Sequence, residues 1–167
     1  MCKSDTVLTQ VITGTTYAGY AKRLIYQMKF VPDRTAALLV AKWLDGIVSA
    51  LDVDVVTWVP TANKRVRERG FDHSKLIAKH FAELRSLPVD ELLYRMGKAR
   101  QVGSQKLTRR QQIRGVFLPS KPIYQQKVLI IDDIVTTGAT LNEATKILKQ
   151  AGASKVTSLT FAQSVSN

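Results

Sequence analysis

The chain has 167 residues, of which 45% are hydrophobic and 23% charged, and these values are typical of one globular domain rather than a disordered or fibrous chain. Its formal net charge of +12 predicts anionic partners, such as pyrophosphate, nucleotides, nucleic acid or a membrane surface. The sequence has no apolar run of membrane-spanning length, and its single cysteine, Cys2, excludes an internal disulfide. We therefore expect one domain over residues 1–167, without membrane insertion, in the cytoplasm.

Two amphipathic helices are predicted in the first third of the chain, after residues 1–12, which show little regular pattern. Apolar residues at spacings of three and four predict a helix over 17–30, which Pro32 ends. The same spacing predicts a second helix over 33–50, with Asp33 as its N-cap. A strand over 54–60 and a basic loop over 61–70 are then expected.

Strands and helices alternate through the rest of the chain. Asp72 is the N-cap of a predicted third helix that includes Leu84, and the segment 97–114 is a polar, basic connection. The other predicted elements are strands over 92–94, 115–118, 127–132 and 155–161, and a helix over 141–151. This alternation predicts an α/β fold: a mostly parallel twisted sheet flanked by helices, with two leading helices. Its ligand should lie at the carboxyl edge of the sheet.

The segment 128–140 reads VLIIDDIVTTGAT and carries the chemistry. Its aliphatic run predicts a buried strand that places Asp132 and Asp133 at the ligand-binding edge. Carboxylates accept hydrogen bonds from sugar hydroxyls. The turn that follows directs backbone N–H groups and hydroxyls at a helix start, which suits a phosphate; it comprises Thr136, Thr137, Gly138, Ala139 and Thr140. The segment therefore predicts a ribose-5-phosphate site, although a buried strand and a capped helix without a ligand are the structural alternative.

Two motifs resemble known families. Residues 128–140 resemble the PRPP-binding signature of type I phosphoribosyltransferases. Residues 64–71 (KRVRERGF), after Pro60, resemble the motif of ComF-type proteins, and further matches run in the family's order from about Tyr17. The resemblance implies the type I phosphoribosyltransferase fold. ComF-type proteins often carry an N-terminal zinc ribbon, which Cys2 alone cannot build, so we expect it to be absent or outside this chain.

The resemblance also implies roles for individual residues. Asp132 and Asp133 would hold the ribose hydroxyls, and residues 136–140 the 5′-phosphate. The pyrophosphate would be bound by Thr61, Lys64 and Arg65. The segment 97–114 corresponds to a catalytic hood, whose catalytic candidates are Lys106 and Arg109. Mg²⁺ would be bound with PRPP, without a metal site made by the protein alone. His73 and His80 are expected to be structural.

Several functions remain open at this point. One is pentosyl transfer from PRPP to an acceptor, for which the sequence has no recognisable base-reading motif. ComF-type proteins are associated with uptake of single-stranded DNA in natural transformation, which implies such DNA and competence helicase or DNA-processing proteins as partners. The binding alternative is a single-stranded DNA-binding protein whose PRPP site is vestigial or regulatory; a PRPP-sensing regulator is a third.

A basic surface supports the DNA-binding alternative. Residues 95–127 contain nine Lys and Arg residues and no Asp or Glu, with Tyr94, Phe117 and Tyr124 nearby. The arginines expected to contact nucleic acid are Arg67, Arg69, Arg100, Arg110 and Arg114. A solvated loop, with its arginines paired to Glu68, is the alternative for residues 64–69.

Overall fold

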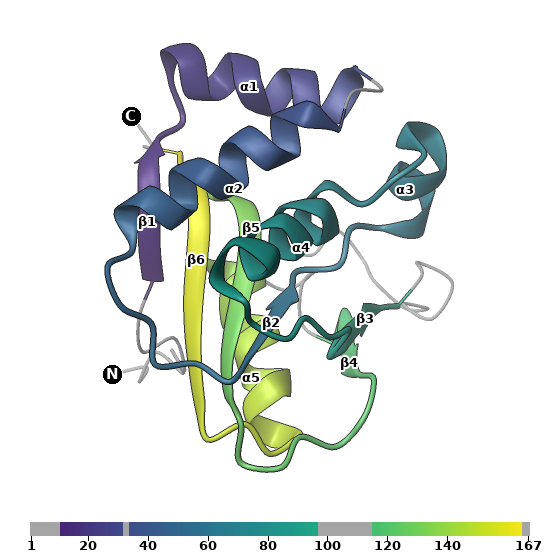
Figure 1. Ribbon diagram of the computed structural model, residues 1–167. Coiled ribbons are helices and arrows are strands. Elements are labelled where there is room, and N and C mark those ends of the chain that lie inside the picture. The colour runs from purple at the N-terminus through teal and green to yellow at the C-terminus, as the bar shows by residue number, and fades with distance from the viewer. Residues whose placement is uncertain (1–10, 32–33, 97–114, 165–167) are drawn as a thin grey trace, which may run out of the picture.

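A four-stranded parallel sheet is the centre of the molecule. The structure, a computed structural model, describes residues 11–31, 34–96 and 115–164. The strands lie in the order β1-β6-β5-β2 (Figure 1). Their bounds are Val11–Thr16 for β1, Lys155–Gln163 for β6, Lys127–Val135 for β5 and Val55–Trp58 for β2. A separate antiparallel pair is formed by β3 (Leu93–Arg95) and β4 (Phe117–Pro119).

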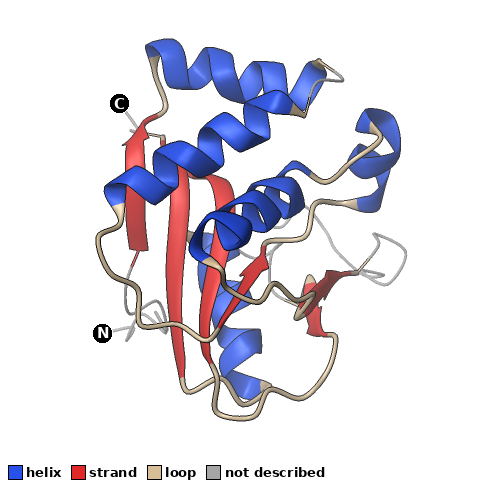
Figure 2. Cartoon of the chain, viewed as in Figure 1, coloured by secondary structure: helices blue, strands red, loops and turns tan. Residues whose placement is uncertain are grey.

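Helices cover both faces of the sheet (Figure 2). One face carries α1 (Gly19–Phe30), α2 (Thr35–Ile47) and α4 (His73–Arg85). The other carries α5 (Ala139–Gln150), beside the β3–β4 pair. A short helix, α3 (Asn63–Arg69), follows β2 at the carboxyl edge. No helix within the described ranges has the length and apolar character needed to cross a membrane.

The sequence of β5 explains why both faces are covered. Leu129 and Ile131 pack with Phe161 against α1, α2 and α4, whereas Val128 and Ile130 pack on the opposite face toward α5. Successive side chains of a strand point to opposite faces, so an unbroken aliphatic run must be buried on both. This is why β5 is a central strand of a parallel sheet with helices on both faces, as the sequence predicted.

Most of the expected elements are present, and the sheet with β5-α5-β6 as a parallel unit confirms the α/β fold class. Three local expectations were wrong. A strand, β1, precedes the two leading helices, in a region where little pattern was expected. Residues 61–70 contain the helix α3 instead of only a loop. Finally, β5 continues past Asp132 to Val135.

Tertiary pairing is the reason for two of these differences. β1 is a threonine-rich edge strand that pairs with β6 from Val11 to Thr16. The extension of β5 is paired with β6 as far as Val135 and Gln163. The helix α3 has a local cause: its Lys, Arg and Glu residues favour helix, and Gly70, with φ of 80°, ends it by donating its N–H to the Val66 carbonyl.

Candidate functional site

The two carboxylates of the signature segment, Asp132 and Asp133, lie inside β5, near its carboxyl end. Their residues are 9% and 7% exposed. Asp133 faces the helices α1 and α4. Asp132 Oδ1 accepts the backbone N–H of Asp133 at 2.9 Å and the hydroxyl of Ser74, on α4, at 3.2 Å. The neighbours therefore sit in different surroundings although they share one strand.

Asp133 is held by partners from two helices. Its Oδ2 forms an ion pair with Lys29, from the last turn of α1, and lies 3.3 Å from His73 Nε2, in the first turn of α4. Its Oδ1 accepts the N–H of Ile134 at 2.9 Å. Burial by itself would raise the pKa of Asp133, but the hydrogen bond from His73 and the charge of Lys29 outweigh it and hold this pKa well below its usual range.

Asp132 has the opposite shift. Burial, and then the charge of Asp133, raise its pKa well above the usual range, against the hydrogen bonds from Asp133 N–H and Ser74. Within the described part of the chain, its Oδ2 makes no hydrogen bond or ion pair. Asp132 Oδ2 is therefore the carboxylate oxygen with capacity left for a ligand hydroxyl.

The turn after β5 forms a small cavity at the start of α5. The cavity has a volume of about 250 Å³ and is lined by Thr136, Thr137 and Gly138, together with Val11 and Thr13 of β1, Val135 and Gln163. Gly138 has φ of 71° and precedes the first helical residue, Ala139, whose N–H donates to Thr137 Oγ1 at 3.5 Å. The first N–H groups of a helix have no partners within the helix and attract anions, so this cavity suits a phosphate.

Among the residues expected to bind pyrophosphate, Thr61 is hydrogen-bonded to Asp72. Its N–H and its hydroxyl both donate to Asp72, at 2.8 Å and 3.0 Å, and Asp72 also caps α4. Lys64 is 87% exposed and pairs with Glu68 at 3.8 Å, while Arg65 is exposed on the same helix. The loop is thus anchored by Thr61 and presents cations from α3.

Arg95, which sequence reasoning missed, lies at the end of β3. Burial, and then the charge of Arg65, lower its pKa, whereas the charge of Asp132 acts in the opposite direction. Arg95 is therefore a partly buried cation that is destabilised by Arg65 and stabilised by Asp132, and an anion bound beside Arg65 would stabilise it further.

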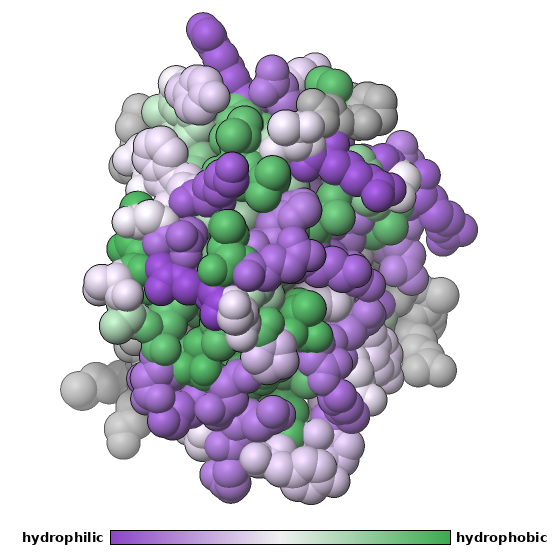
Figure 3. Space-filling view, viewed as in Figure 1, coloured by the Kyte–Doolittle hydropathy of each residue, from purple (hydrophilic) through white to green (hydrophobic). Residues whose placement is uncertain are grey.

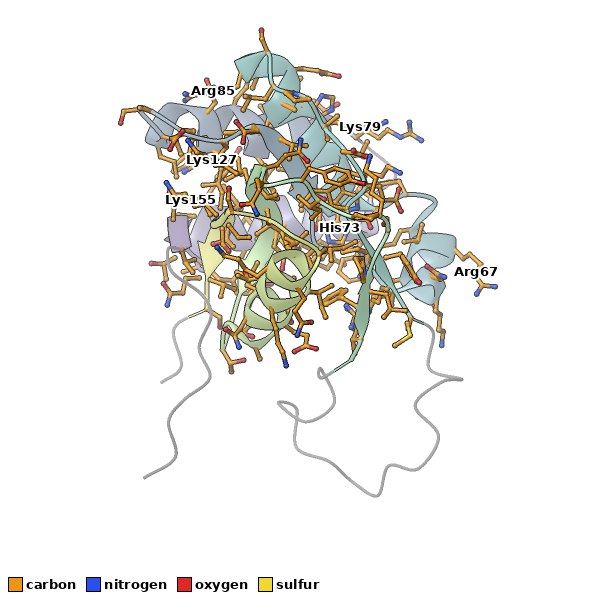
Figure 4. The ribbon with its side chains drawn as sticks, turned by 90° about the horizontal axis from the view of Figure 1, so that it is seen from below. Arg67, His73, Lys79, Arg85, Lys127 and Lys155 are labelled. Carbon is orange, nitrogen blue, oxygen red and sulfur yellow. The ribbon has the colours of Figure 1, made fainter. Side chains whose placement is uncertain are left out.

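The predicted nucleic-acid arginines are separated by the fold. Arg67 is exposed and projects away from the body of the molecule (Figure 4). Arg69 instead turns inward: its guanidinium lies 3.4 Å from His73 Nδ1 and 5.5 Å from the ring centroid of Phe30. Lys106 and Arg109, as well as Arg100, Arg110 and Arg114, lie outside the described residues.

Lys29, His73 and Ser74 are further site residues that the sequence did not indicate. His73 was expected to be structural; it lies inside the molecule (Figure 4), and its Nε2 is 3.3 Å from Asp133 Oδ2. Its place beside the N-cap Asp72 was the one available signal. Lys29 had no comparable signal, because only the packing of α1 over the sheet brings it to Asp133.

Comparisons with known proteins identify the family of the chain. Residues 75–166 match the phosphoribosyl transferase domain. The chain is 24% identical over 143 residues to "Competence protein F" of Haemophilus influenzae, covering 81% of this chain and 62% of that protein. It is 28% identical over 156 residues to "DNA utilization protein YhgH" of Escherichia coli O157:H7, covering 88% of this chain and 69% of that protein.

A solved structure shares the fold. Glutamine phosphoribosylpyrophosphate (PRPP) amidotransferase from B. subtilis matches with a TM-score of 0.60 and 23% identity, covering 81% of this chain and 30% of that one. The chain thus spans less than two thirds of the length of competence protein F and about a third of the amidotransferase.

Proposed function

The chain belongs to the phosphoribosyl transferase domain family, and on this basis we propose that it binds PRPP with Mg²⁺ through residues 128–140. One observation supports this proposal above the others: a carboxylate oxygen without a partner, on Asp132, lies on the same strand that leads into the cavity at the N-terminus of α5. A ribose 5-phosphate needs a hydroxyl acceptor and a phosphate cradle at neighbouring positions.

Different residues bind different parts of PRPP in this proposal. Residues 136–140 hold the 5′-phosphate, and Asp132 and Asp133 hold the ribose hydroxyls, with Asp132 Oδ2 as the open acceptor. Arg65 and Arg95 offset the charge of the pyrophosphate, joined by Lys64, while Thr61 fixes their loop through Asp72. This arrangement positions the ligand and stabilises the charge that develops on a leaving pyrophosphate.

Mg²⁺ suits this set of residues as a companion of the ligand. Within the described residues, no cluster of three or more His, Cys, Asp and Glu side chains could hold a metal ion. The oxygens of PRPP and water would provide most of the ligands, as is usual for Mg²⁺ on phosphates. When bound, the ion neutralises charge on the pyrophosphate.

Transfer would form a bond from an acceptor, usually a nitrogen base, to C1 of the ribose. The bond from C1 to the pyrophosphate oxygen breaks, and pyrophosphate leaves with the electron pair. The hood candidates Lys106 and Arg109 would supply charge to this leaving group. The names of two relatives, "Competence protein F" and "DNA utilization protein YhgH", favour a role in DNA uptake during natural transformation. We further propose that the protein acts in the cytoplasm, with a competence helicase or DNA-processing protein as partner.

Calorimetric titration of PRPP with Mg²⁺ tests the proposal. We expect binding to the native chain and none to the Asp132→Asn/Asp133→Asn variant, which removes both negative charges and replaces one acceptor oxygen of each side chain by an NH₂ donor. The matched control is Asp52→Asn/Asp54→Asn, which removes two carboxylates at the amino end of the same sheet and should bind PRPP normally. Equal loss in both variants, or no binding to the native chain, would refute the site. With binding established, pyrophosphate release on adding an acceptor would show turnover.

A second cavity favours single-stranded DNA binding as a second function. It has a volume of about 480 Å³ and lies between α3, α4 and β3, and neither Asp132 nor Asp133 lines it. Its lining combines aromatic and cationic side chains, among them Phe71, Tyr94, Arg34, Lys75 and Lys79. It also contains the carboxylates of Asp72 and Glu91, and it shares Thr61 and Arg95 with the proposed pyrophosphate site. Figure 3 shows hydrophilic groups with apolar groups between them over α3 and α4. Stacking surfaces beside cations suit the bases and phosphates of a single strand.

Fluorescence anisotropy with a labelled oligonucleotide tests this second function. We expect Tyr94→Ser/Lys79→Gln to weaken binding by about tenfold, because one stacking surface and one phosphate contact are lost. Tyr20→Ser/Lys22→Gln removes an exposed tyrosine and an exposed lysine from α1 and should bind like the native chain. Equal effects of the two variants would show that the cavity takes no nucleotide.

A further inference from the structure

Arg69 contacts both elements that supply partners to Asp133. Its guanidinium lies 3.4 Å from His73 Nδ1, and the other ring nitrogen of His73 lies 3.3 Å from Asp133 Oδ2. The same guanidinium lies over the ring of Phe30, next in sequence to Lys29, which forms the ion pair with Asp133. One side chain of α3 thus touches the last turn of α1 and the first turn of α4.

These contacts define the state of the His73 ring. A guanidinium has only donors, so His73 Nδ1 must accept and cannot carry a proton. A carboxylate has only acceptors, so His73 Nε2 must carry the proton and donate it to Asp133. The charged groups that contact the ring are Arg69 from α3 and Asp133 from β5, and Lys29 from α1 pairs with the same oxygen of Asp133. A second proton, on Nδ1, would face the Arg69 guanidinium directly.

Burial makes this arrangement specific. His73 and Asp133 are 4% and 7% exposed, so water has little access to replace a partner that is lost. The order Arg69, His73, Asp133 also connects α3, whose cations face the pyrophosphate in the proposed function, with the carboxylates expected to hold the ribose. A buried chain of contacts of this kind restricts the orientation of its last member, Asp133.

We propose that Arg69 is a positioning residue for the ribose-binding carboxylates: it holds His73 as the Nε2–H tautomer and packs on Phe30, and thereby fixes both partners of Asp133. This inference rests on the proposed function for its ligand and assigns Arg69 an indirect role. Arg69 acts through His73 and Lys29 and does not contact PRPP.

The tautomer can be measured without any ligand. The chain has two histidines, so long-range ¹H–¹⁵N spectra of the imidazoles contain two sets of signals, and His80→Gln assigns them. We expect an unprotonated Nδ1 and a protonated Nε2 on His73 at pH 7, and a shifted Nδ1 signal in Arg69→Met, because Nδ1 loses its donor while Asp133 still accepts from Nε2. A protonated Nδ1 in the native chain, or an unchanged ring in Arg69→Met, would overturn the proposal even if PRPP does not bind.

Two ligands separate positioning from direct contact. Ribose 5-phosphate has the hydroxyls of PRPP but no pyrophosphate. Loss of an orienting hydrogen bond to a charged group corresponds to about tenfold in affinity, so we expect Arg69→Met to weaken both ligands about tenfold. Weakening of PRPP alone would mean that Arg69 binds pyrophosphate directly and would refute the positioning role. Lys22→Met, which removes one exposed charge from α1, is the control for net charge.

A conservative variant provides the rescue. Glutamine can donate from its amide nitrogen to Asp133 and accept from Arg69 at its amide oxygen, so it reproduces both hydrogen bonds of the neutral ring. We therefore expect His73→Gln to bind both ligands within about threefold of the native chain, and His73→Leu to lose about tenfold. Equal loss in the two variants would exclude the proposed chain of hydrogen bonds from Arg69 through His73 to Asp133. Absence of binding by the native chain would refute only the proposed function.

Discussion

Asp132 and Asp133 show how far two adjacent carboxylates can differ. Both are buried, which by itself raises the pKa of each. Asp133 has the Nε2–H of His73 and the ammonium of Lys29 to stabilise its charge, whereas Asp132 has the hydroxyl of Ser74 and the negative charge of its neighbour. The site is therefore built around one stabilised carboxylate and one destabilised carboxylate.

The destabilised carboxylate should limit the stability of the ligand-free protein. Because folding raises the pKa of Asp132, its contribution to stability is full at low pH and is lost as the pH rises through the folded-state pKa. We expect Asp132→Asn to raise the free energy of unfolding at neutral pH while weakening PRPP binding. Urea denaturation at pH 7 measures this, and a less stable variant would contradict it.

The contribution of Lys29 to the stability of the fold should be largest at pH values where Asp133 is charged. The pair is mostly buried, so Lys29→Met leaves an unpaired carboxylate and should cost about 3 kcal/mol at pH 7. Folding lowers the pKa of Asp133, so its contribution is present above the unfolded value of about 3.9 and is lost as the pH falls through the folded-state value. The difference between native chain and variant should therefore shrink in acid.

Urea denaturation at pH 7 and pH 3 tests this dependence. Lys22→Met, on the exposed side of the same helix, should cost little at either pH. A constant difference between Lys29→Met and the native chain at both values would show that Lys29 stabilises the fold by packing alone.

At the scale of elements, local periodicity predicted what local forces determine. The helices α1, α2 and α4 were predicted from apolar spacing. The strands β2 and β5 were predicted from β-forming and aliphatic runs, and α5 and β6 from their place after β5 in the alternating order. The edge strand β1 was missed because its six residues, with Gly14 and three threonines, carry little apolar alternation. β6 supplies its pairing, and no local window contains that information.

Two glycines should respond in opposite directions to alanine. Gly152, after α5, has φ of 112°, and an added Cβ would lie 2.0 Å from the Ile123 carbonyl oxygen. Gly152→Ala should therefore lower the free energy of unfolding by about 2 kcal/mol or more. Gly46 lies exposed in α2 with open space around it, so Gly46→Ala should raise the free energy of unfolding by about 0.5–1 kcal/mol. Thermal or urea unfolding measures both. Equal effects would mean that the turn after α5 adapts.

For the whole molecule, the net charge of +12 makes affinity for nucleic acid dependent on salt. We expect oligonucleotide binding to fall with salt at a log–log slope of about −2 to −4, as for roughly three to six neutralised phosphates. Asp132→Asn/Asp133→Asn should preserve this binding, because it removes no cation. Loss of DNA binding by the folded double variant would show that the two sites are not separate, and a slope near zero would exclude a phosphate-tracking surface.

The sequence by itself determined the fold class, the central strand and the segment 128–140, because these depend on residues close together in the chain. Only the tertiary structure decided which carboxylate is open. Lys29, Arg69, His73 and Arg95 reach the site from four different elements, and their distances from Asp132 and Asp133 follow from helix packing. Burial and charge at one point in space are sums over the whole fold, so no single segment of the sequence could specify them.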